Sequence, residues 1–281
     1  MMQFDVTDLR VSFPDFTRKR PFRRPPLVEV LHGVSLEVAR GDAIGIVGES
    51  GSGKSTLARA LLRLVDIAGG SIRFDGQDIG GLSEDQLRPL RRRMQIIFQD
   101  SQSALNPRRT IGAIVAEPLL SNGLAGSPRQ ARRKAIELLE QAGLSEQFAG
   151  RYAHQLSGGQ RQRVGIARAL ALDPAVIVAD EIVSGLDVSV QAQILQLLDQ
   201  LRRDRGLTLL LISHDLSVVR ATCARVVVMR GGNIVESGAT AEVFEHPREK
   251  YTQTLLRAIP LPDVDPDWIH RVQLEEYAAP A

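Results

Sequence analysis

The sequence is poor in the residues that define several large classes of protein. Among its 281 residues there is one cysteine, Cys223, so an internal disulfide and any metal or iron–sulfur site made only of cysteines are excluded within this chain. The formal net charge is only +2. So small an excess of basic residues gives no strong electrostatic case for binding nucleic acid.

Long apolar segments are also lacking. No apolar run in the sequence approaches the roughly 18 residues that a membrane-spanning helix needs. The N-terminus, Met1–Asp5, has neither the basic region nor the apolar region of a secretion signal. We therefore expect a soluble, cytosolic chain that reaches a membrane only through a partner protein.

The sequence does contain enough apolar residues for a sizeable core. Hydrophobic residues make up 43% of the chain, which fits one large domain or a domain with a subdomain. Short apolar runs at Ala43–Val47, Ala175–Ala179 and Thr208–Ser213 alternate with helical patterns. Continuous apolar strands between helices predict an α/β fold whose parallel sheet is covered on both faces.

Two other segments have different patterns. Apolar residues alternate from Phe4 to Phe13, which predicts a strand region near the N-terminus. From about Thr110 to Leu144 the pattern is helical, with breaks at Asn122-Gly123 and at Gly126–Pro128. We interpret this helical segment as an insertion into the α/β domain.

A glycine-rich loop follows the first apolar run. The residues Gly48–Ser55 lie between the expected strand Ala43–Val47 and a predicted helix from about Lys54 to Val65, which is the context of a phosphate-binding loop. In such a loop the backbone N–H groups hold phosphates, Lys54 reaches the outer phosphates and the Ser55 hydroxyl ligates Mg²⁺. The sequence therefore predicts a nucleoside triphosphate site.

A second helix start with glycines lies far along the chain, in Leu156–Gln160. Ser157 and Gln160 match the Ser-x-x-Gln pattern in which two side chains cap the start of a helix. The exposed N–H groups and the helix dipole attract a phosphate, and Gly158 and Gly159 let it approach. One ATP does not need two such sites in a single chain, so we expect ATP to be shared between two chains.

Together these motifs resemble the nucleotide-binding subunit of an ABC transporter, over a region from about Leu9 to Pro260. The resemblance implies an α/β fold with a RecA-like P-loop NTPase core, an inserted α-helical subdomain and an N-terminal antiparallel β region. It implies an ABC ATPase domain at residues 1–240, with the helical subdomain inserted at about 100–157, and a C-terminal helical extension and tail at 241–281. It also implies hydrolysis of ATP with Mg²⁺.

Paired acidic residues end one of the buried strands. Asp180 and Glu181 follow Val176–Ala179, so they emerge at the carboxyl edge of the sheet, where ligands of open α/β sheets bind. Such a pair can divide its work between holding Mg²⁺ and activating water. By resemblance, Asp180 ligates the metal and Glu181 is the catalytic base. His214 resembles the histidine that contacts the terminal phosphate, and Gln99 resembles the glutamine that senses Mg²⁺ and the attacking water.

Further positions depend on the resemblance as well. The segment Ser184–Asp187 resembles the loop by which each family member contacts its dimer mate. Phe13 is predicted to stack on adenine, because an aromatic ring can stack on a base without a particular surrounding sequence. Phe16 is an alternative stacking residue, and Phe13 could instead belong to the core. Ile182 replaces the family's usual proline, and Gly185 stands where alanine is common. Neither change removes a reacting group, although Gly185 adds backbone freedom to the dimer loop.

The predicted functional residues form five sets. The residues predicted to bind ATP are Phe13, Gly48, Glu49, Ser50, Gly51, Ser52, Gly53, Lys54, Ser55 and Thr56. The signature segment, which would cover the ATP of the opposite subunit, comprises Leu156, Ser157, Gly158, Gly159 and Gln160. The dimer loop comprises Ser184, Gly185, Leu186 and Asp187. The catalytic residues are Glu181, His214 and Gln99, and the Mg²⁺ ligands are Ser55, Gln99 and Asp180.

Three segments narrow the resemblance to the ATPases of oligopeptide, dipeptide and nickel importers. They are Phe98–Asp100 with Ser103–Arg108, then Leu186–Gln193, and the tail His246–Pro260. In that branch two ATPase subunits, identical or paralogous, pair beneath two transmembrane permease subunits that are served by an extracytoplasmic solute-binding protein. The resemblance implies a peripheral protein on the cytoplasmic face of the bacterial inner membrane, with a peptide-like or metal-chelate solute and no nucleic acid partner.

Other functions fit the sequence less well. An exporter would use the same ATPase chemistry, so the direction of transport stays open. A soluble ABC ATPase acting on nucleic acid or ribosomes usually has coiled-coil or zinc-bearing insertions, and a phosphate-loop kinase would not need Leu156–Gln160. The intact acids Asp180 and Glu181 disfavour a purely regulatory module. The basic, proline-rich segment Thr17–Pro26 predicts an exposed loop, either a solvated connection or a contact with lipid headgroups or a membrane partner.

Overall fold

The computed structural model describes residues 1–18, 25–99 and 104–257. Most of the basic loop Arg18–Arg24, part of the segment Phe98–Arg108 and the tail from residue 258 lie outside the described residues. Contacts within the chain divide it into two compact units. Of the described residues, unit 1 contains Met1–Arg91 and residues 208–257, and unit 2 contains Arg92–Leu207.

Unit 1 begins with an antiparallel sheet. Its strands lie in the order β2-β1-β4-β5, and their bounds are Met2–Pro14 (β1), Leu27–Ala39 (β2), Gly69–Phe74 (β4) and Gln77–Asp78 (β5). β1 pairs with β2 from Met2↔Ala39 to Pro14↔Leu27 and also pairs with β4. The alternating apolar residues of β1 are buried from Phe4 to Val11, and the ring centroids of Phe4 and Phe74 lie 5.2 Å apart. The predicted N-terminal strand region is confirmed.

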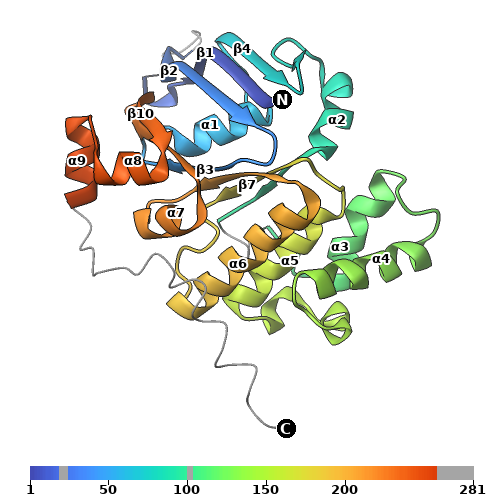
Figure 1. Ribbon diagram of the computed structural model, residues 1–281. Helices are drawn as coiled ribbons and strands as arrows, with labels where there is room; N and C mark the ends of the chain where they lie inside the picture. Colours follow the sequence, from blue (N-terminus) through green and yellow to red (C-terminus); the bar gives the residue numbers. More distant parts are fainter. Residues whose placement is uncertain (19–24, 100–103, 258–281) are drawn as a thin grey trace. The chain divides into compact units, whose positions relative to one another are not determined.

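Unit 1 also contains parallel strands. β3 (Ala43–Val47) lies between β8 (Thr208–Ile212) and β9 (Arg225–Arg230) and is parallel to both, and β10 (Asn233–Ala239) is antiparallel to β9. Every residue of β3 and β8 is buried, which is why their sequences are unbroken apolar runs. At Gly45 a Cβ atom would lie 2.2 Å from Val219 Cγ1. The glycine therefore allows the helix that contains Val219, α7, to approach the strand (Figure 1).

Among the described residues, five α-helices belong to unit 1. They are α1 (Lys54–Leu61), α2 (Glu84–Arg92), α7 (Leu216–Thr222), α8 (Thr240–Glu245) and α9 (Lys250–Arg257). The last residue of α2, Arg92, already belongs to unit 2. α8 and α9 lie in the region where the resemblance implies a C-terminal helical extension. α2 was not predicted, because it is short, Leu87 is its only buried residue and Pro89 lies inside it.

The helix after the phosphate loop is shorter than predicted. α1 ends at Leu61 rather than at about Val65. Arg63 adopts a left-handed backbone conformation, with φ of 51°. The N–H groups of Arg63 and Leu64 bond back to carbonyls of the last helical turn, at 2.9 and 2.8 Å. This is the Schellman pattern, which ends a helix.

Unit 2 contains two parallel strands and a group of helices. β6 (Met94–Ile97) pairs with β7 (Val176–Asp180), and every residue of β7 is buried. The helices are α3 (Ile111–Ser121), α4 (Pro128–Gln141), α5 (Gly158–Leu170) and α6 (Val188–Arg205), with short 3-10 turns at Glu146–Gly150 (η2) and Ala153–Gln155 (η3). α3 contacts both α4 and α5 (Figure 1). The helical segment expected from about Thr110 is therefore confirmed as helical.

The break predicted at Gly126–Pro128 is the start of α4. Ser127 Oγ accepts the N–H group of Gln130 at 3.2 Å. Pro128 lies in the first turn, where its missing N–H group costs no helical hydrogen bond. The serine cap and the proline together fix where the helix begins.

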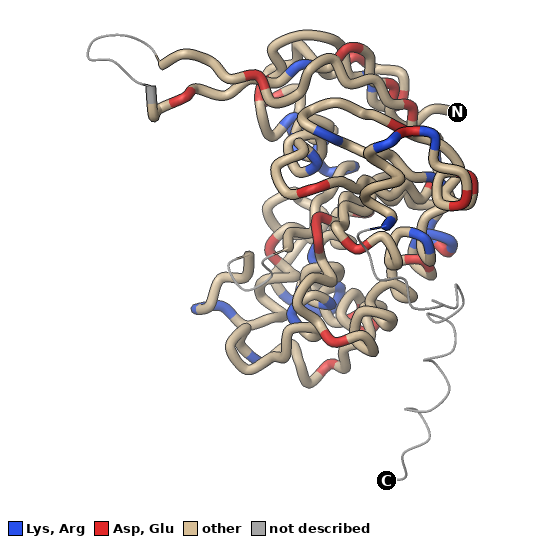
Figure 2. The backbone as a smooth tube through the Cα atoms, turned by 90° about the vertical axis from the view of Figure 1, so that its left-hand side faces the viewer, with Lys and Arg blue, Asp and Glu red and all other residues tan. Residues whose placement is uncertain are grey.

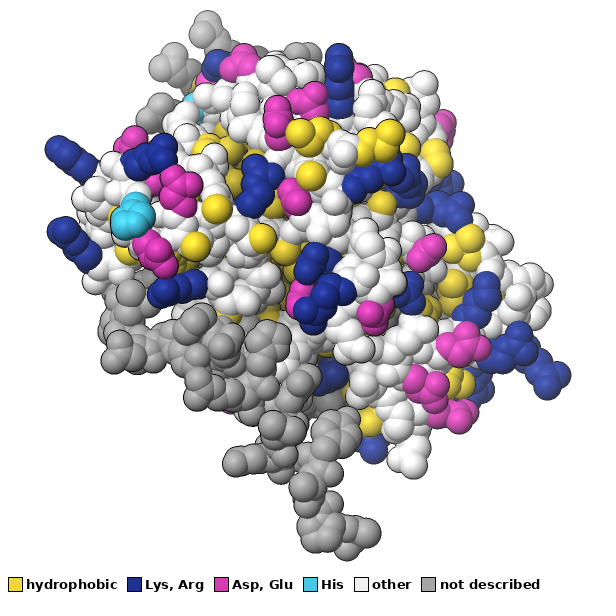
Figure 3. All heavy atoms as spheres, viewed as in Figure 1, with side chains coloured by type: hydrophobic (Ala, Val, Ile, Leu, Met, Phe, Trp, Pro, Cys, Tyr) yellow, Lys and Arg dark blue, Asp and Glu magenta, His cyan; other side chains and the backbone are white. Residues whose placement is uncertain are grey.

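Charged residues of both signs are mixed over the molecule. Basic and acidic positions are interspersed along the backbone of each unit (Figure 2). On the face drawn in Figure 3, hydrophobic side chains lie in small groups among charged ones. Within the described ranges, no helix combines the length and the apolar character that crossing a bilayer requires.

Candidate functional site

The phosphate loop connects β3 to α1 in unit 1, and its glycines are required by the backbone. A Cβ atom at Gly48 would lie 2.1 Å from the carbonyl oxygen of Met229. Gly51 and Gly53 have φ of 78° and 101°, which is the left-handed region that favours glycine. A loop of this shape presents its N–H groups toward a phosphate.

Lys54 is fixed against the loop. Its side chain is buried, and Nζ donates to the carbonyl oxygens of Gly48 at 2.8 Å and Glu49 at 2.7 Å. Gly53, the N-cap residue of α1, provides no side-chain cap for the first turn. The first N–H groups of α1, with Ser55 and Thr56 in the same turn, therefore form a helix start that suits an anion.

His214 lies on the same edge of unit 1 as the phosphate loop. β3 and β8 are parallel, with Ile46 opposite Ile212, so the residues that follow both strands emerge at one edge. His214 is exposed and lies between β8 and α7. The turn is ordered by Asp215, whose carboxylate caps α7 by accepting the N–H group of Ser217 at 2.9 Å.

Phe13 lies near the end of β1. It is 37% exposed and pairs with Val28 on β2. Phe16, in the 3-10 turn η1 (Phe16–Arg18), is 67% exposed. Phe13 is thus not a fully buried core residue, and both phenylalanines have exposed surface, so both remain candidates for stacking on adenine.

Asp180 and Glu181 end the buried strand of unit 2. Asp180 is the last residue of β7 and is 7% exposed. Glu181 has φ of 49°, a left-handed conformation that costs an ordinary L-residue about 1–2 kcal/mol. The next residue, Ile182, is fully buried, so the position where the family commonly has proline is part of the core in this chain. The strand and the buried residue after it fix the two carboxylates at its carboxyl end.

Gln99 is exposed and follows β6. Its backbone carbonyl accepts a hydrogen bond from Nε2 of Gln162, at 3.2 Å. Gln162 belongs to α5 and is itself buried. Within unit 2 the backbone at Gln99 is therefore joined to the helix that begins with the signature segment.

The signature segment starts α5 with the predicted capping box. Ser157 Oγ accepts the N–H group of Gln160 at 3.3 Å, and Gln160 Oε1 accepts the N–H group of Ser157 at 3.0 Å. The capping prediction is confirmed. Leu156, just before the cap, is buried and anchors the segment.

The dimer loop lies against the signature glycines. A Cβ atom at Gly158 would lie 2.9 Å from Leu186 Cδ2, and one at Gly159 would lie 2.4 Å from Val190 Cγ1. Within unit 2 the structure thus brings together two segments that the sequence analysis treated separately. Val190 lies outside both motifs.

Asp187 ends the dimer loop and caps α6. Its Oδ1 accepts the N–H group of Val190 at 2.9 Å and the hydroxyl of Ser189 at 2.8 Å. These bonds, the first more than the second, hold the pKa of Asp187 below its usual range. Gly185 has φ of 75°, so glycine suits this position better than the alanine that is common in the family.

Tyr251, on α9, is a contact of the phosphate loop that the sequence analysis missed. The N–H group of Glu49 donates to its hydroxyl oxygen at 3.1 Å. In the sequence this tyrosine is part of the tail pattern His246–Pro260. No local signal could have revealed the contact, because the two residues lie far apart along the chain.

Comparison with known proteins identifies the family. The family model described as ABC transporter matches residues 31–184 of this chain. The chain belongs to the ABC transporter family. The family predicted from the sequence is therefore confirmed.

Individual members of the ABC transporter family resemble this chain over most of its length. The oligopeptide transport ATP-binding protein OppF of Salmonella typhimurium is 44% identical over 278 residues, which cover 99% of this chain and 83% of the relative. The solved dimeric structure of the ATP-binding cassette MJ0796, in a post-hydrolysis state bound to ADP and Pi, has a TM-score of 0.73 and 32% identity, and the match covers 84% of this chain and 98% of that one.

A second solved structure supports the same fold. CbiO1 from Clostridium perfringens, part of the ABC transporter complex cbiONQ, has a TM-score of 0.74 and 27% identity, over 87% of this chain and 91% of that one. These likenesses confirm the predicted fold class, an α/β RecA-like P-loop core with an antiparallel β region.

Proposed function

We propose that this chain is the ATP-binding and ATP-hydrolysing subunit of an importer for a peptide-like or metal-chelate solute. The proposal rests chiefly on one observation, that the chain contains two helix N-termini whose backbone N–H groups can bind a phosphate. Gly53 begins α1 without a side-chain cap, and Ser157 begins α5 beside two glycines. The similarity to OppF, whose name states oligopeptide transport, supports the importer branch.

The phosphate loop holds the phosphates of ATP in this proposal. Lys54, fixed by the carbonyls of Gly48 and Glu49, brings a positive charge to the outer phosphates. His214, on the same edge of unit 1, contacts the terminal phosphate. Phe13 stacks on the adenine ring.

The residues assigned to Mg²⁺ have the donor chemistry that this ion requires. Ser55, Asp180 and Gln99 supply hydroxyl, carboxylate and amide oxygens, which Mg²⁺ prefers as ligands. Bound with ATP, the ion would neutralise charge on the phosphates and polarise the reacting phosphoryl group. Glu181 orients the attacking water and accepts its proton.

The signature segment Leu156–Gln160 covers the ATP of a second ATPase subunit. Since ATP contacts both chains only in the closed dimer, it binds the closed state more tightly and shifts the population toward it. Loss of the terminal phosphate reopens the dimer. The helical subdomain, at about 100–157, passes this motion to two transmembrane permease subunits, and residues 241–281 form a C-terminal extension.

The same proposal gives the cellular setting. The chain lies on the cytoplasmic face of the bacterial inner membrane as a peripheral protein. Its ATPase mate is a second copy or a paralogue, and an extracytoplasmic solute-binding protein delivers the solute to the permeases. The similarity to OppF over 99% of this chain supports this assembly.

Replacement of Glu181 tests the chemistry. Glu181→Gln keeps the size of the side chain and removes the base, so we expect ATP binding near that of the wild type and turnover reduced by about 10²–10⁴-fold. Steady-state phosphate release and calorimetric ATP binding measure the two effects. Glu146→Gln, an exposed position in η2 of the same unit, is a matched change of charge. If Glu181→Gln hydrolyses ATP as fast as this control, Glu181 is not the catalytic base.

Dimerisation tests the shared site. The size of the Glu181→Gln protein, measured with ATP in the absence of Mg²⁺, should shift from monomer to dimer. A shift that requires an added paralogous ATPase subunit would identify the mate as a paralogue. If ATP binds but neither partner produces a dimer, the assignment of Leu156–Gln160 to the partner's ATP is wrong.

A further inference from the structure

The C-terminal helix α9 reaches the phosphate loop through one side chain. Tyr251 is 8% exposed, and its hydroxyl oxygen accepts the N–H group of Glu49 at 3.1 Å. The carbonyl oxygen of the same residue, Glu49, accepts a hydrogen bond from Lys54 Nζ at 2.7 Å. The backbone of Glu49 is thus held at its N–H group by the tyrosine and bound at its carbonyl by the lysine.

The tyrosine is itself fixed by β9. The guanidinium of Arg230, the last residue of β9, lies 4.9 Å from the centroid of the Tyr251 ring, a distance at which a cation is attracted to an aromatic face. The turn after β9 also contacts the loop, because the N–H group of Gly232 donates to the carbonyl of Ser52 at 3.0 Å. The phosphate loop is therefore held at two points, Glu49 and Ser52, by elements near the C-terminus.

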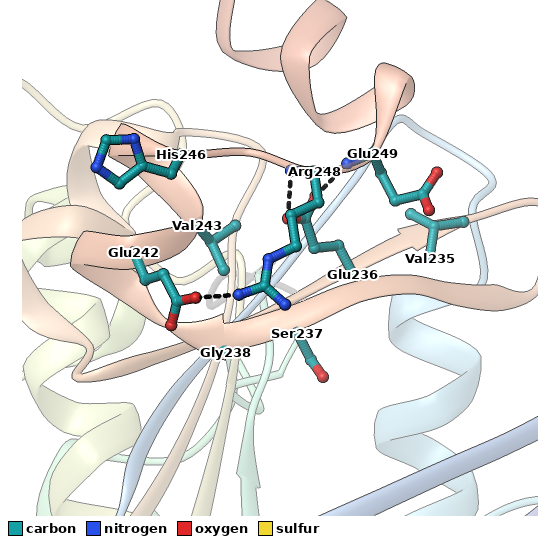
Figure 4. Close-up of a pocket in the computed structure, with 9 residues that line it drawn as sticks. All are labelled: Val235, Glu236, Ser237, Gly238, Glu242, Val243, His246, Arg248 and Glu249. Carbon is teal, nitrogen blue, oxygen red and sulfur yellow. Dashed lines mark hydrogen bonds and ion pairs between the residues drawn. The ribbon is translucent and has the colours of Figure 1, made fainter.

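The start of α9 is anchored to β10. Both carboxylate oxygens of Glu236 accept backbone N–H groups, from Arg248 at 2.8 Å and from Glu249 at 3.2 Å (Figure 4). Burial raises the pKa of Glu236, but these two bonds, the Thr252 hydroxyl and the charge of Arg248 together outweigh burial, and the pKa is lowered. Arg248 also forms an ion pair with Glu242 of α8 (Figure 4). These contacts fix the position from which Tyr251 extends.

We propose that Tyr251 is a positioning residue for ATP binding, which sets the backbone of Glu49 and through it the ammonium group of Lys54. The proposal rests on the proposed ATPase function. The loop contains several glycines and has many accessible conformations once a restraint is removed. Because the loop contacts the phosphates before and during the reaction, a loosened loop weakens substrate and transition state alike. The KM therefore rises while kcat is retained.

The test is Tyr251→Phe in the full-length chain. The ring and its packing remain, and only the acceptor for the Glu49 N–H group is lost. Loss of one such hydrogen bond in Tyr251→Phe should raise the Kd and the KM for ATP by about two- to tenfold. The kcat should stay within about twofold of the wild-type value. Thr254→Val is the matched control, since the Thr254 hydroxyl bonds the Lys250 carbonyl at 2.9 Å within α9 and does not contact the loop.

The outcomes separate this inference from the proposed function. A wild-type chain that neither binds nor hydrolyses ATP would overturn the proposed function itself. If the wild type binds ATP and Tyr251→Phe has the same Kd and KM as Thr254→Val, the inference fails and the proposed function stands. A fall in kcat and in melting temperature at unchanged KM would also overturn it, because that result identifies a structural role only.

Discussion

Gly159→Ala perturbs the contact between the signature helix α5 and α6. A Cβ atom at Gly159 would lie 2.4 Å from Val190 Cγ1, whereas Cβ and Cγ2 of Val190 would lie at 3.7 and 3.8 Å. The overlap therefore falls on one methyl group. That methyl group cannot move easily, because the Val190 N–H group is bonded to Asp187 at 2.9 Å and a β-branched side chain has one strongly preferred rotamer in a helix.

The expected free-energy change has two opposing parts. Forcing an extra methyl group into a packed interior costs about 1–3 kcal/mol. Replacing glycine by alanine stabilises the middle of a helix by about 0.5–1 kcal/mol, and the gain is smaller at Gly159, the second residue of α5. We therefore expect Gly159→Ala to lower the free energy of unfolding by about 1 kcal/mol. Val190→Ala removes the methyl group that would overlap. The free energy of unfolding of the double variant Gly159→Ala/Val190→Ala should therefore exceed, by about 1–3 kcal/mol, the value expected from adding the effects of the two single changes.

Urea unfolding of the wild type, the two single variants and the double variant gives the coupling energy directly. Gly158→Ala is the control, because its Cβ atom would lie 2.9 Å from Leu186 Cδ2, the end of a flexible side chain, and it should destabilise the chain less. A cycle that is additive within about 0.5 kcal/mol would refute the packing argument. If the double variant regains stability but does not regain ATP-driven dimerisation, Gly159 is also required for a phosphate to approach the start of α5.

Two further predictions concern single carboxylates. Glu181→Gly should be at least as stable in urea unfolding as Glu181→Ala. The left-handed backbone at this position costs an L-residue about 1–2 kcal/mol, and glycine removes that cost. A clearly more stable alanine variant would contradict the left-handed conformation. Since the pKa of Glu236 is lowered from its ordinary value of 4.5, its contribution to stability is complete above that pH and is lost as the pH falls through the folded-state pKa. The stability difference between wild type and Glu236→Gln should therefore shrink below pH 4.5, and a difference that persists unchanged there would refute the role of the Glu236 carboxylate.

The sequence predicted well those elements whose cause is local. The buried strands β3, β7 and β8 are unbroken apolar runs because both of their faces are covered. The start of α5 follows from Ser157 and Gln160, whose reciprocal bonds involve only residues within one turn. In these cases the physical reason for the structure lies within a few residues of the motif.

Prediction failed where the cause lay outside the local pattern. α2 is short, only Leu87 in it is buried and Pro89 lies inside it, so the local sequence gave little reason to predict a helix. α1 ends early because Arg63 takes a left-handed conformation, which glycine or asparagine usually marks and arginine does not. The contact between Gly159 and Val190 depends on how two helices approach each other, and nothing in either segment alone encodes that distance.

Each of the two helix starts that can bind phosphate is thus contacted by a residue outside the phosphate-loop, signature and dimer-loop motifs. Tyr251 holds the loop proposed to bind the chain's own ATP, and Val190 lies against the segment proposed to cover the partner's ATP. A change at Tyr251 should therefore alter the affinity of the monomer for ATP, whereas a change at Val190 should alter ATP-driven dimerisation. Nucleotide affinity measured below the concentration at which dimers form, and dimerisation measured at saturating ATP, separate the two effects. If both variants changed both quantities equally, the two helix starts would be coupled within one chain, and the division of ATP between two chains would need another explanation.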